Sequence, residues 1–299
     1  MCIMGKNVVI LDIDTGIDDA VALVFAHALE NIDLQLISTV YGNVSIDKVN
    51  HNTLVICEDI DCNTEIVQGE NKAIKSTDFN VSAHGKNGLG SYTHPVTREI
   101  SKNYYIDEIH RVVRNNELTN IVACGPLTNL AKYILAHPEE SDRVRVVLVT
   151  GLLENDKENP YLNFNLSKDV EALKIVLKNY KHIVFVPSDM GHISYIKAED
   201  FNKTAECGRV GQILASMYPF HMDRTVSNGA ALHDLCGVLF LAHPELFETK
   251  PALTELKATP KGSYLDFDYS ARKPNTLIAT NIDIKKMHNL YYKTLKGLK

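Results

Sequence analysis

The chain has 299 residues, of which 45% are hydrophobic and 23% are charged, and its formal net charge at pH 7 is −6. This is the composition of an ordinary globular protein, long enough for one large α/β domain or two small ones. The acidic balance argues against a general nucleic-acid-binding surface or an acidic-membrane-binding surface.

The first predicted element is a buried strand at residues 8–11, a continuous apolar run rich in β-branched residues. Asp12 and Asp14 follow it two residues apart, and they point to the same side if the extended backbone continues. Apolar residues at helical spacing from Ile17 onward predict a helix. The acids therefore collect at the carboxyl end of a strand, where open α/β sheets bind ligands.

The most informative feature of the chain is a group of four carboxylates within eight residues, Asp12, Asp14, Asp18 and Asp19. Any one of them is explained by helix capping, but capping requires only one or two acids. Like charges this close repel one another unless a cation lies among them, so the group predicts a metal site. Without a neighbouring Cys or His pair, the acids favour Ca²⁺ or Mg²⁺ over Zn²⁺. An EF-hand is excluded because a helix begins directly after Gly16.

Further strands are predicted at residues 34–41, 120–124, 144–150 and 183–186, with helical segments between them. This alternation predicts an α/β fold of Rossmann-like type, with an open, mainly parallel (mixed) sheet and helices on both faces. Residues 264–269 and 276–278 predict a small C-terminal antiparallel addition before a final helix from Ile284. No repeat or linker interrupts the chain, so residues 1–299 are expected to form a single domain.

Polar motifs follow several of the predicted strands. Gly42-Asn43, taken alone, is an ordinary turn. In Gly125-Pro126 the proline suits the first turn of a helix. The glycine-rich segment 84–90 lacks both the P-loop and the dinucleotide-binding spacing. Amides cluster at residues 159–165, and His233-Asp234 opens an apolar helix.

Taken in chain order, these motifs resemble those of the calcium-dependent nucleoside hydrolases of the inosine-uridine-preferring type. Residues 12–20 are similar to the family's N-terminal fingerprint, which usually has Pro where this chain has Thr15. Residues 39–43, 84–90, 125–131, 164–165 and 233–234 resemble its later motifs. The resemblance implies hydrolysis of the N-glycosidic bond of ribonucleosides to ribose and a free base, with a Ca²⁺-activated water.

The resemblance also implies roles for individual residues. Ca²⁺ would be held by Asp14, Asp19, Asp234 and the backbone carbonyl of Cys124, with Asp14 as the general base and Asp12 supporting the site from behind. The substrate would be bound by Asp18, Asn43, His84, Asn163, Asn165 and Asp234. His233 is the implied acid for the leaving base, and the alternative is a histidine that only bonds the helix backbone.

Two positions depart from the family pattern. Asn163 stands where the family commonly has Glu, so an amide replaces the charged contact expected at the ribose 5′-hydroxyl. The loop at residues 156–160 is shorter than usual, which leaves a role for Asn159 open. The base pocket has four candidate residues, for which a solvated helix face is an equal explanation: Tyr218, His221, Arg224 and Asn228.

Two other function classes fit parts of the sequence. A Mg²⁺-dependent phosphatase of the haloacid dehalogenase type also begins with a strand and Asp-x-Asp, but it needs Thr or Val at the position of Gly16 and leaves Asp18 and Asp19 without a role. A non-catalytic nucleoside- or calcium-binding homologue would keep the acids for affinity alone.

The expected setting is the reduced cytoplasm. The six cysteines are scattered without the spacing of a zinc site. We find no stretch with the pattern of a signal peptide or a transmembrane helix. The expected partners are a small-molecule ribonucleoside and, from the resemblance, further copies of the chain in a homodimer or homotetramer. No nucleic-acid or membrane partner is expected.

The replacement at Asn163 gives a prediction about the sugar. Hydrogen bonds to charged groups contribute about 1.5–3 kcal/mol, against about 1 kcal/mol for neutral ones. We therefore expect a weak requirement for the 5′-hydroxyl, with 5′-deoxyuridine cleaved at a kcat/KM close to that of uridine. Uridine 5′-monophosphate tests whether the lost negative charge also admits a 5′-modified ribosyl group. A strong preference for the unmodified 5′-hydroxyl would contradict this interpretation.

Overall fold

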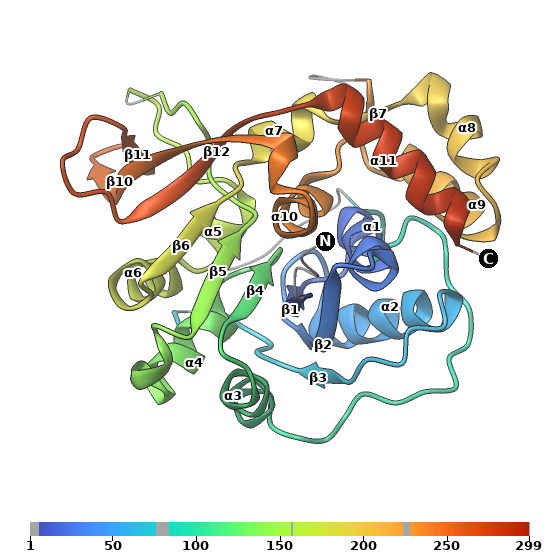
Figure 1. Cartoon of the computed structure of the whole chain (residues 1–299), viewed down its shortest axis with the longest axis horizontal. Coiled ribbons are helices and arrows are strands. Elements are labelled where there is room, and N and C mark those ends of the chain that lie inside the picture. Colours follow the sequence, from blue (N-terminus) through green and yellow to red (C-terminus); the bar gives the residue numbers. More distant parts are fainter. Residues whose placement is uncertain (1–5, 76–83, 157, 224–227, 299) are drawn as a thin grey trace, which may run out of the picture.

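A computed structural model describes residues 6–75, 84–156, 158–223 and 228–298. Within them, nine strands form one sheet in the order β11-β10-β12-β6-β5-β4-β1-β2-β3 (Figure 1). All neighbours from β12 to β3 are parallel, whereas β10 runs antiparallel to both β11 and β12. The strands are β1 (Asn7–Ile13), β2 (Ile32–Thr39), β3 (Ile66–Gln68), β4 (Thr119–Ala123), β5 (Val144–Leu148), β6 (His182–Phe185), β10 (Phe247–Thr259), β11 (Gly262–Asp268) and β12 (Thr276–Ile282).

Helices cover both faces of this sheet, as the sequence predicts. One face carries α1 (Ile17–Ala28), α2 (Ile46–Asp59), α9 (Arg209–Met217), α10 (His233–Ala242) and α11 (Ile284–Gly297). The other face carries α3 (Tyr105–Asn115), α4 (Thr128–Ala136) and α6 (Val170–Asn179). The shorter elements are α5 (Phe164–Lys168), α7 (Ser188–Ile193), α8 (Phe201–Ala205) and a second sheet of β7 (Ile196–Lys197), β9 (Gly229–Ala230) and β8 (Met222–Asp223).

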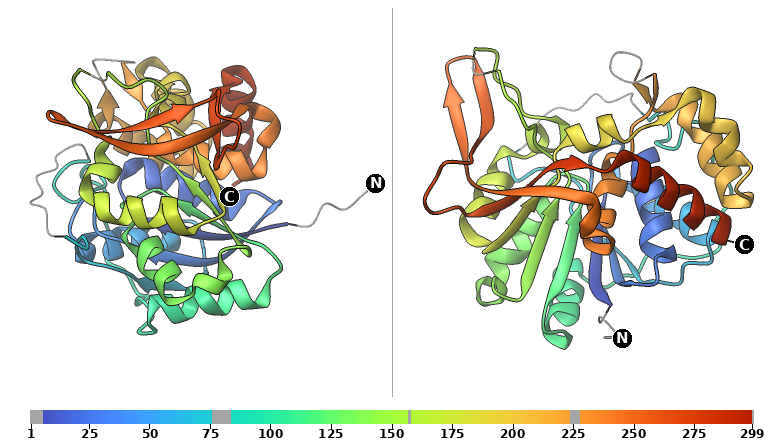
Figure 2. Two further views of the ribbon diagram at one scale, coloured as in Figure 1. Left: turned by 90° about the vertical axis from the view of Figure 1, so that its left-hand side faces the viewer. Right: turned by 45° about the horizontal axis from the view of Figure 1, so that its top comes forward.

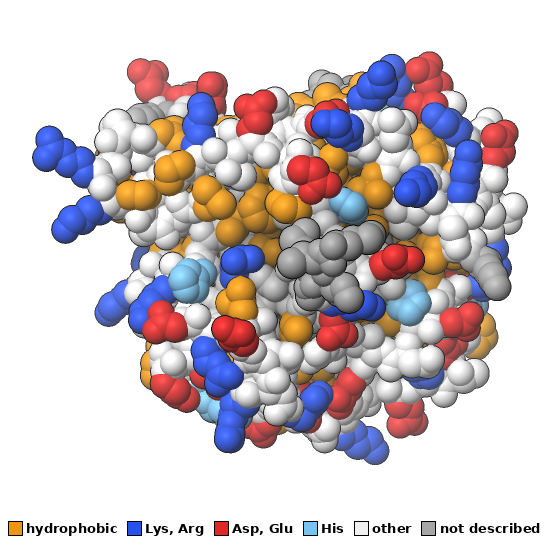
Figure 3. All heavy atoms as spheres, in the orientation of Figure 1, with side chains coloured by type: hydrophobic (Ala, Val, Ile, Leu, Met, Phe, Trp, Pro, Cys, Tyr) orange, Lys and Arg blue, Asp and Glu red, His pale blue; other side chains and the backbone are white. Residues whose placement is uncertain are grey.

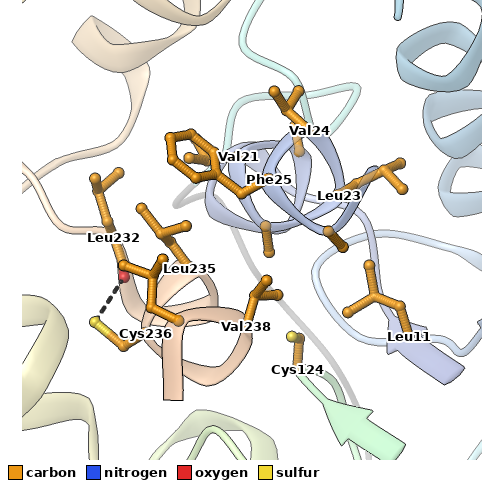
Figure 4. Packing of buried hydrophobic residues seen from close by; sticks show 14 of the residues in the cluster. Leu11, Val21, Leu23, Val24, Phe25, Cys124, Leu232, Leu235, Cys236 and Val238 are labelled. Atoms are coloured by element: carbon orange, nitrogen blue, oxygen red, sulfur yellow. Dashed lines mark hydrogen bonds between the residues drawn. The ribbon is translucent and has the colours of Figure 1, made fainter. Parts of the chain in front are cut away.

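The two faces have separate hydrophobic cores because side chains alternate along each strand. Leu11 of β1 packs with Phe25 of α1 and Leu235 of α10 in the first core (Figure 4). Ile10, the preceding residue, belongs to the second core beneath α3 and α4. Both residues are fully buried, so β1 is covered on both sides, as a central strand of a parallel sheet must be.

The chain order places a ligand crevice beside β1. From β1 the chain proceeds to β2 and β3 on one side of the sheet, and later to β4, β5 and β6 on the other. The connections therefore diverge between β1 and β4. In open α/β sheets, the carboxyl ends of the strands at such a switch point form the usual ligand-binding crevice.

The strands predicted at residues 8–11, 34–41, 120–124, 144–150 and 183–186 are confirmed as β1, β2, β4, β5 and β6. The small C-terminal antiparallel addition and the final helix from Ile284 are also confirmed, with β10 antiparallel to both β11 and β12. The structure adds that β12 also joins the parallel sheet beside β6, and that the unpredicted strand β10 lies between β12 and β11. The sequence did not reveal β10 because only two of its thirteen residues are buried and Pro251 lies inside it.

The C-terminal strands extend the sheet beyond the helical layers. Figure 2 shows β10 and β11 projecting from the body of the molecule. On the face shown in Figure 3, acidic and basic side chains are interspersed, and hydrophobic side chains gather in a band across its upper left part. Among the described helices, we find none with both the length and the hydropathy that a bilayer-spanning segment requires.

Candidate active site

The first part of the site is formed by the turn from β1 into α1. Asp14 follows β1, and Asp19 lies in the first turn of the helix. Asp19 accepts hydrogen bonds from the backbone N–H groups of Gly16 (2.8 Å) and Asp14 (3.3 Å). Gly16 is the N-cap of α1, whose N–H has no helical partner, and Asp14 lies in the turn before it, so the local fold itself orients this carboxylate.

The loop after β2 closes over Asp14. The backbone N–H of Asn43 donates to Asp14 Oδ2 (2.7 Å), and its side-chain Nδ2 donates to Asp19 Oδ2 (3.1 Å). A Cβ atom at Gly42 would lie 1.9 Å from Asp14 Oδ2, so only glycine allows this approach. The Gly42-Asn43 pair, which alone suggests an ordinary turn, thus forms one wall of the acidic site.

Two further segments complete this acidic site. Cys124 follows β4, and its carbonyl accepts a hydrogen bond from Asn165 Nδ2 of α5. Asp234 lies in the first turn of α10. Oxygen or sulfur atoms of Asp19, Cys124 and Asp234 lie within 4.8 Å of one another, and all three residues are buried. Segments that are more than 100 residues apart in the chain therefore supply one group of ligand atoms.

Burial controls the protonation of these acids. It raises the pKa of Asp14 and of Asp234 well above the ordinary range, and the neighbouring carboxylates Asp19 and Asp18, respectively, add to the shift. For Asp19, burial and then Asp18 raise the pKa to about 7. Burial also raises the pKa of Asp12 to about 7, although Ser38 (2.5 Å) and Asn129 (2.7 Å) donate hydrogen bonds to its Oδ1. Without a cation, the acids partly retain their protons.

These residues fit a hard divalent cation. The acids are held in place by backbone and amide donors, and their carboxylates converge. Oδ2 of Asp12 and Oδ1 of Asp18 are buried without a hydrogen-bond partner. Buried carboxylate oxygens that lack donors cost free energy unless a ligand satisfies them.

Histidines form the other side of the site. Asp18 Oδ2 lies 3.8 Å from His221 Nε2, and Asp18 Oδ1 lies 3.9 Å from His84 Nδ1. Burial opposes ionisation of Asp18, but the imidazoles, His221 first, lower its pKa overall. His84 Nδ1 accepts a hydrogen bond from the backbone N–H of Ile17 (3.1 Å), so its proton lies on Nε2. Burial lowers the pKa of His84 to about 4.

His233 begins α10, as predicted, and its ring does contact the backbone. Its Nδ1 donates to the carbonyl of Ser188 (3.1 Å), which leaves Nε2 for other partners. The side chain of the same Ser188 is bound by Asn163, whose Nδ2 donates to Ser188 Oγ (3.1 Å). Oδ1 of Asn163 accepts a hydrogen bond from the hydroxyl of Thr150 (2.6 Å). Burial lowers the pKa of His233 to about 4.

These groups surround one pocket of about 300 Å³. The predicted residues that line it are Asp18, Asn43, His84, Cys124, Asn163, Asn165, His221, His233 and Asp234, while Asp12, Asp14 and Asp19 are buried beside them. Tyr161 and Phe164, from the amide-rich segment 159–165, also line it. The sequence analysis did not single out the remaining lining residues, of which the last two lie on α7: Val149, Leu152, Ser188 and His192.

Some residues considered for the base pocket lie elsewhere. Tyr218 is fully buried and contacts Tyr291 through their hydroxyl groups, so it belongs to the core. Asn228 is exposed, and Arg224 lies outside the described residues. The exposed loop residue Asn159 bonds to Asp156 (2.9 Å) and does not line the pocket.

The chain is similar to known proteins over most of its length. A model of the inosine-uridine preferring nucleoside hydrolase family matches residues 9–289. The non-specific ribonucleoside hydrolase RihC of Escherichia fergusonii is 29% identical over 286 residues, which cover 93% of this chain and 94% of the relative. The corresponding protein of Salmonella enteritidis is 29% identical over 285 residues, covering 92% and 93%.

Solved structures share the fold. A purine-preferring ribonucleoside hydrolase from Gardnerella vaginalis superposes with a TM-score of 0.89 at 23% identity, covering 97% of this chain and 98% of that chain. An inosine-uridine preferring nucleoside hydrolase from Bacillus anthracis gives a TM-score of 0.81 at 15% identity, covering 98% and 99%. At these identities the likeness supports the fold alone.

The raised pKa values predict how calcium binding depends on pH. Without a cation, the folded protein holds more protons on Asp19 than the unfolded chain, so the contribution of Asp19 to the free energy of unfolding falls as pH rises toward about 7. The raised pKa values of Asp14 and Asp234 act in the same direction. Because Ca²⁺ must displace these protons, its stabilising effect should be larger at pH 8 than at about pH 6. Thermal unfolding with Ca²⁺ or chelator at each pH measures this difference. The site would be contradicted if Ca²⁺ raised Tm equally at the two pH values, or if it raised the Tm of Asp14→Asn as much as that of the unaltered chain. The control is Asp47→Asn, at an exposed acid in the first turn of α2, which should respond to Ca²⁺ normally.

Proposed function

The chain belongs to the inosine-uridine preferring nucleoside hydrolase family and hydrolyses the N-glycosidic bond of ribonucleosides, and we propose that it does so in the pocket between α1 and α10. The observation that carries this proposal is the convergence of four buried acids and the pocket histidines on one cavity. A volume of about 300 Å³ lies at the lower end of the range for small-molecule sites.

We propose Ca²⁺ as the cation, held by the carboxylates of Asp14, Asp19 and Asp234 and the carbonyl of Cys124. The support is a donor set made of oxygens, which Ca²⁺ prefers. Burial raises the pKa of the Cys124 thiol, so the carbonyl rather than the sulfur is the expected ligand. When bound, such an ion lowers the pKa of a water molecule and attracts the hydroxyl groups of the sugar.

Asp14 is proposed as the general base that removes a proton from the attacking water. Its raised pKa suits a carboxylate that must accept a proton near neutral pH. The N–H of Asn43 holds one of its oxygens and so fixes the direction of the other. Asp12 lies two residues earlier, in β1, and through Ser38 and Asn129 it supports the position of that strand.

We propose that the ribose hydroxyls bind to four side chains, those of Asp18, Asn43, Asn165 and Asp234. Asn163 is proposed to face the 5′-hydroxyl of the ribose. Asp18 Oδ1 is a buried acceptor without a donor, which a sugar hydroxyl would supply. Cleavage of the N-glycosidic bond builds positive charge on the sugar ring. Fixed carboxylates nearby stabilise that charge more strongly than they stabilise the neutral substrate.

His233 and His84 are proposed to serve the leaving base. The Nε2 atom of His233 remains available because Nδ1 bonds to Ser188. Burial lowers its pKa to about 4, which leaves the ring mostly neutral at pH 7, whereas the carboxylate of Asp18 favours the protonated form that a general acid requires. His84 carries its proton on Nε2, so it can donate a hydrogen bond to a base while it remains neutral.

The cellular setting and the assembly are also part of the proposal. We propose that the enzyme acts in the cytoplasm as a homodimer or homotetramer. The names of the relatives differ in their preference, from non-specific to purine-preferring, and so they leave the preferred base open.

The activity and its cation are tested together by release of reducing sugar from a panel of purine and pyrimidine ribonucleosides, with Ca²⁺ or with chelator. We expect activity that chelator removes and Ca²⁺ restores. Because a general base contributes about 10²–10⁴-fold, Asp14→Asn should lower kcat at least that much. Asp47→Asn, at the exposed acid of α2, should retain normal activity. Release of phosphate from monoesters without release of sugar would instead support the phosphatase, and binding without turnover would support the non-catalytic homologue.

The role of His233 is tested with two leaving groups. His233→Ala should slow cleavage of inosine, whose base needs a proton, by about 10²–10⁴-fold. The same variant should cleave p-nitrophenyl riboside at nearly the normal rate, because nitrophenolate leaves without protonation. Equal losses on both substrates would show that His233 acts through the structure of the pocket instead.

A further inference from the structure

A second cluster of metal-ligand side chains lies at the opposite edge of the sheet. His110 is on α3, while His137 ends α4 and Glu140 lies in the 3-10 turn Pro138–Glu140 that follows. This turn leads into β5, so it lies at the amino edge of the parallel strands, whereas the acidic pocket lies at their carboxyl edge. The proposed hydrolase activity does not use these residues.

The three side chains are close together and partly enclosed. Each offers a ligand atom, and these atoms lie within 4.8 Å of one another. The rings of His110 and His137 stack with centroids 4.0 Å apart. The side chain of Glu140 is 5% exposed, against 27% for His110 and 21% for His137. The carboxylate therefore forms the floor of the cluster, and the imidazoles form its open side.

Hydrogen bonding within the protein does not fully explain this arrangement. Oε1 of Glu140 lies 2.9 Å from His110 Nδ1, yet that nitrogen is buried without an aligned hydrogen-bond partner. A neutral imidazole carries a lone pair on one ring nitrogen, which is the atom that binds a metal ion. Two ligand atoms at the tetrahedral angle around Zn²⁺, each about 2.0–2.1 Å from it, lie about 3.3 Å apart, so this pair needs only a small separation to hold an ion.

Glu140 also has the support that a metal ligand requires. Its second oxygen, Oε2, accepts a hydrogen bond from the hydroxyl of Tyr133, which is fully buried in α4. Burial raises the pKa of Tyr133, so the hydroxyl remains a donor. Partners of this kind orient ligating carboxylates and strengthen metal binding.

A second turn of similar sequence shows which contacts of this cluster the turn forms by itself and which require other residues. His243-Pro244-Glu245-Leu246 follows α10 as His137-Pro138-Glu139-Glu140 follows α4, with similar backbone angles at the two histidines. In both turns the histidine Nδ1 faces the glutamate two residues later, at 3.3 Å in the first and 3.0 Å in the second. Among the two turns, only the first also has a buried carboxylate, Glu140, and a histidine from another helix, His110. The second turn has Leu246 in place of the carboxylate.

We propose that His110, His137 and Glu140 bind a divalent transition-metal ion of the Zn²⁺ type, which fastens α3 to the turn after α4. Two imidazoles and one carboxylate are the ligands of such ions rather than of Ca²⁺. The stacked rings must tilt for both to reach one ion, and the partly exposed His137 has room to do so. This site is independent of the hydrolytic pocket.

The experiment is a titration of the full chain with Zn²⁺ at pH 7.5 and with Ca²⁺ in excess, followed by calorimetry and thermal unfolding. We expect binding at one site and a rise in Tm. His110→Asn and His137→Asn should each weaken Zn²⁺ binding at least tenfold, while His243→Asn should leave it unchanged. Tyr133→Phe should weaken it about 10–100-fold, as the loss of a supporting hydrogen bond does elsewhere.

A spectroscopic probe covers the case of a variant that folds poorly. Co²⁺ bound to the unaltered chain should show visible absorption bands that added Zn²⁺ removes, with release of the Co²⁺. The proposal is overturned if Zn²⁺ binding persists in both His110→Asn and His137→Asn, because the ion then lies elsewhere, such as among the pocket histidines. It is also overturned if His243→Asn weakens binding as much as His137→Asn.

Discussion

The structure depends on holding several carboxylates in a space that water hardly reaches. Burial and mutual repulsion oppose their ionisation, which is why the pKa values of Asp14, Asp19 and Asp234 are raised. Only part of the cost is offset by the helix start and the amide donors around Asp19. The proposed cation would offset the rest and turn a destabilising group of charges into a binding site. In the proposed mechanism the same acids also favour the positive charge that develops on a sugar as its glycosidic bond breaks.

The position of the acids follows from the topology of the sheet. Because β1 and β4 are neighbours whose connections proceed in opposite directions, the crevice at their carboxyl ends lies at the switch point of the sheet. Acids that follow β1 can therefore meet Cys124 and Asp234. The histidines reach the same crevice from the other side, on segments that cross above it. The pocket is thus acidic where a sugar would lie and rich in imidazole where a base would lie.

The cluster at the amino edge of the sheet shows a different use of similar residues. There, the turn itself brings the ring of His137 next to the carboxylate of Glu139. The similar turn at His243 forms the same contact with Glu245, without a further histidine or buried acid beside it among the described residues. Glu140, Tyr133 and His110 make the first copy different. The comparison separates contacts that a turn produces by itself from contacts that require another helix.

The sequence by itself determined the parts of this protein that depend on neighbouring residues. An apolar run followed by closely spaced acids and a helix start was enough to place Asp12, Asp14, Asp18 and Asp19 at a strand end, and the order of the motifs was enough for the family. Only the tertiary structure decided which distant side chains join them. Ser188 and His192 enter the pocket, while Tyr218 is taken into the core, and β12 pairs with β6 rather than with β11. The reason is physical, since periodicity reports which face of an element is buried, whereas the partner that buries it is chosen by packing between segments far apart in the chain.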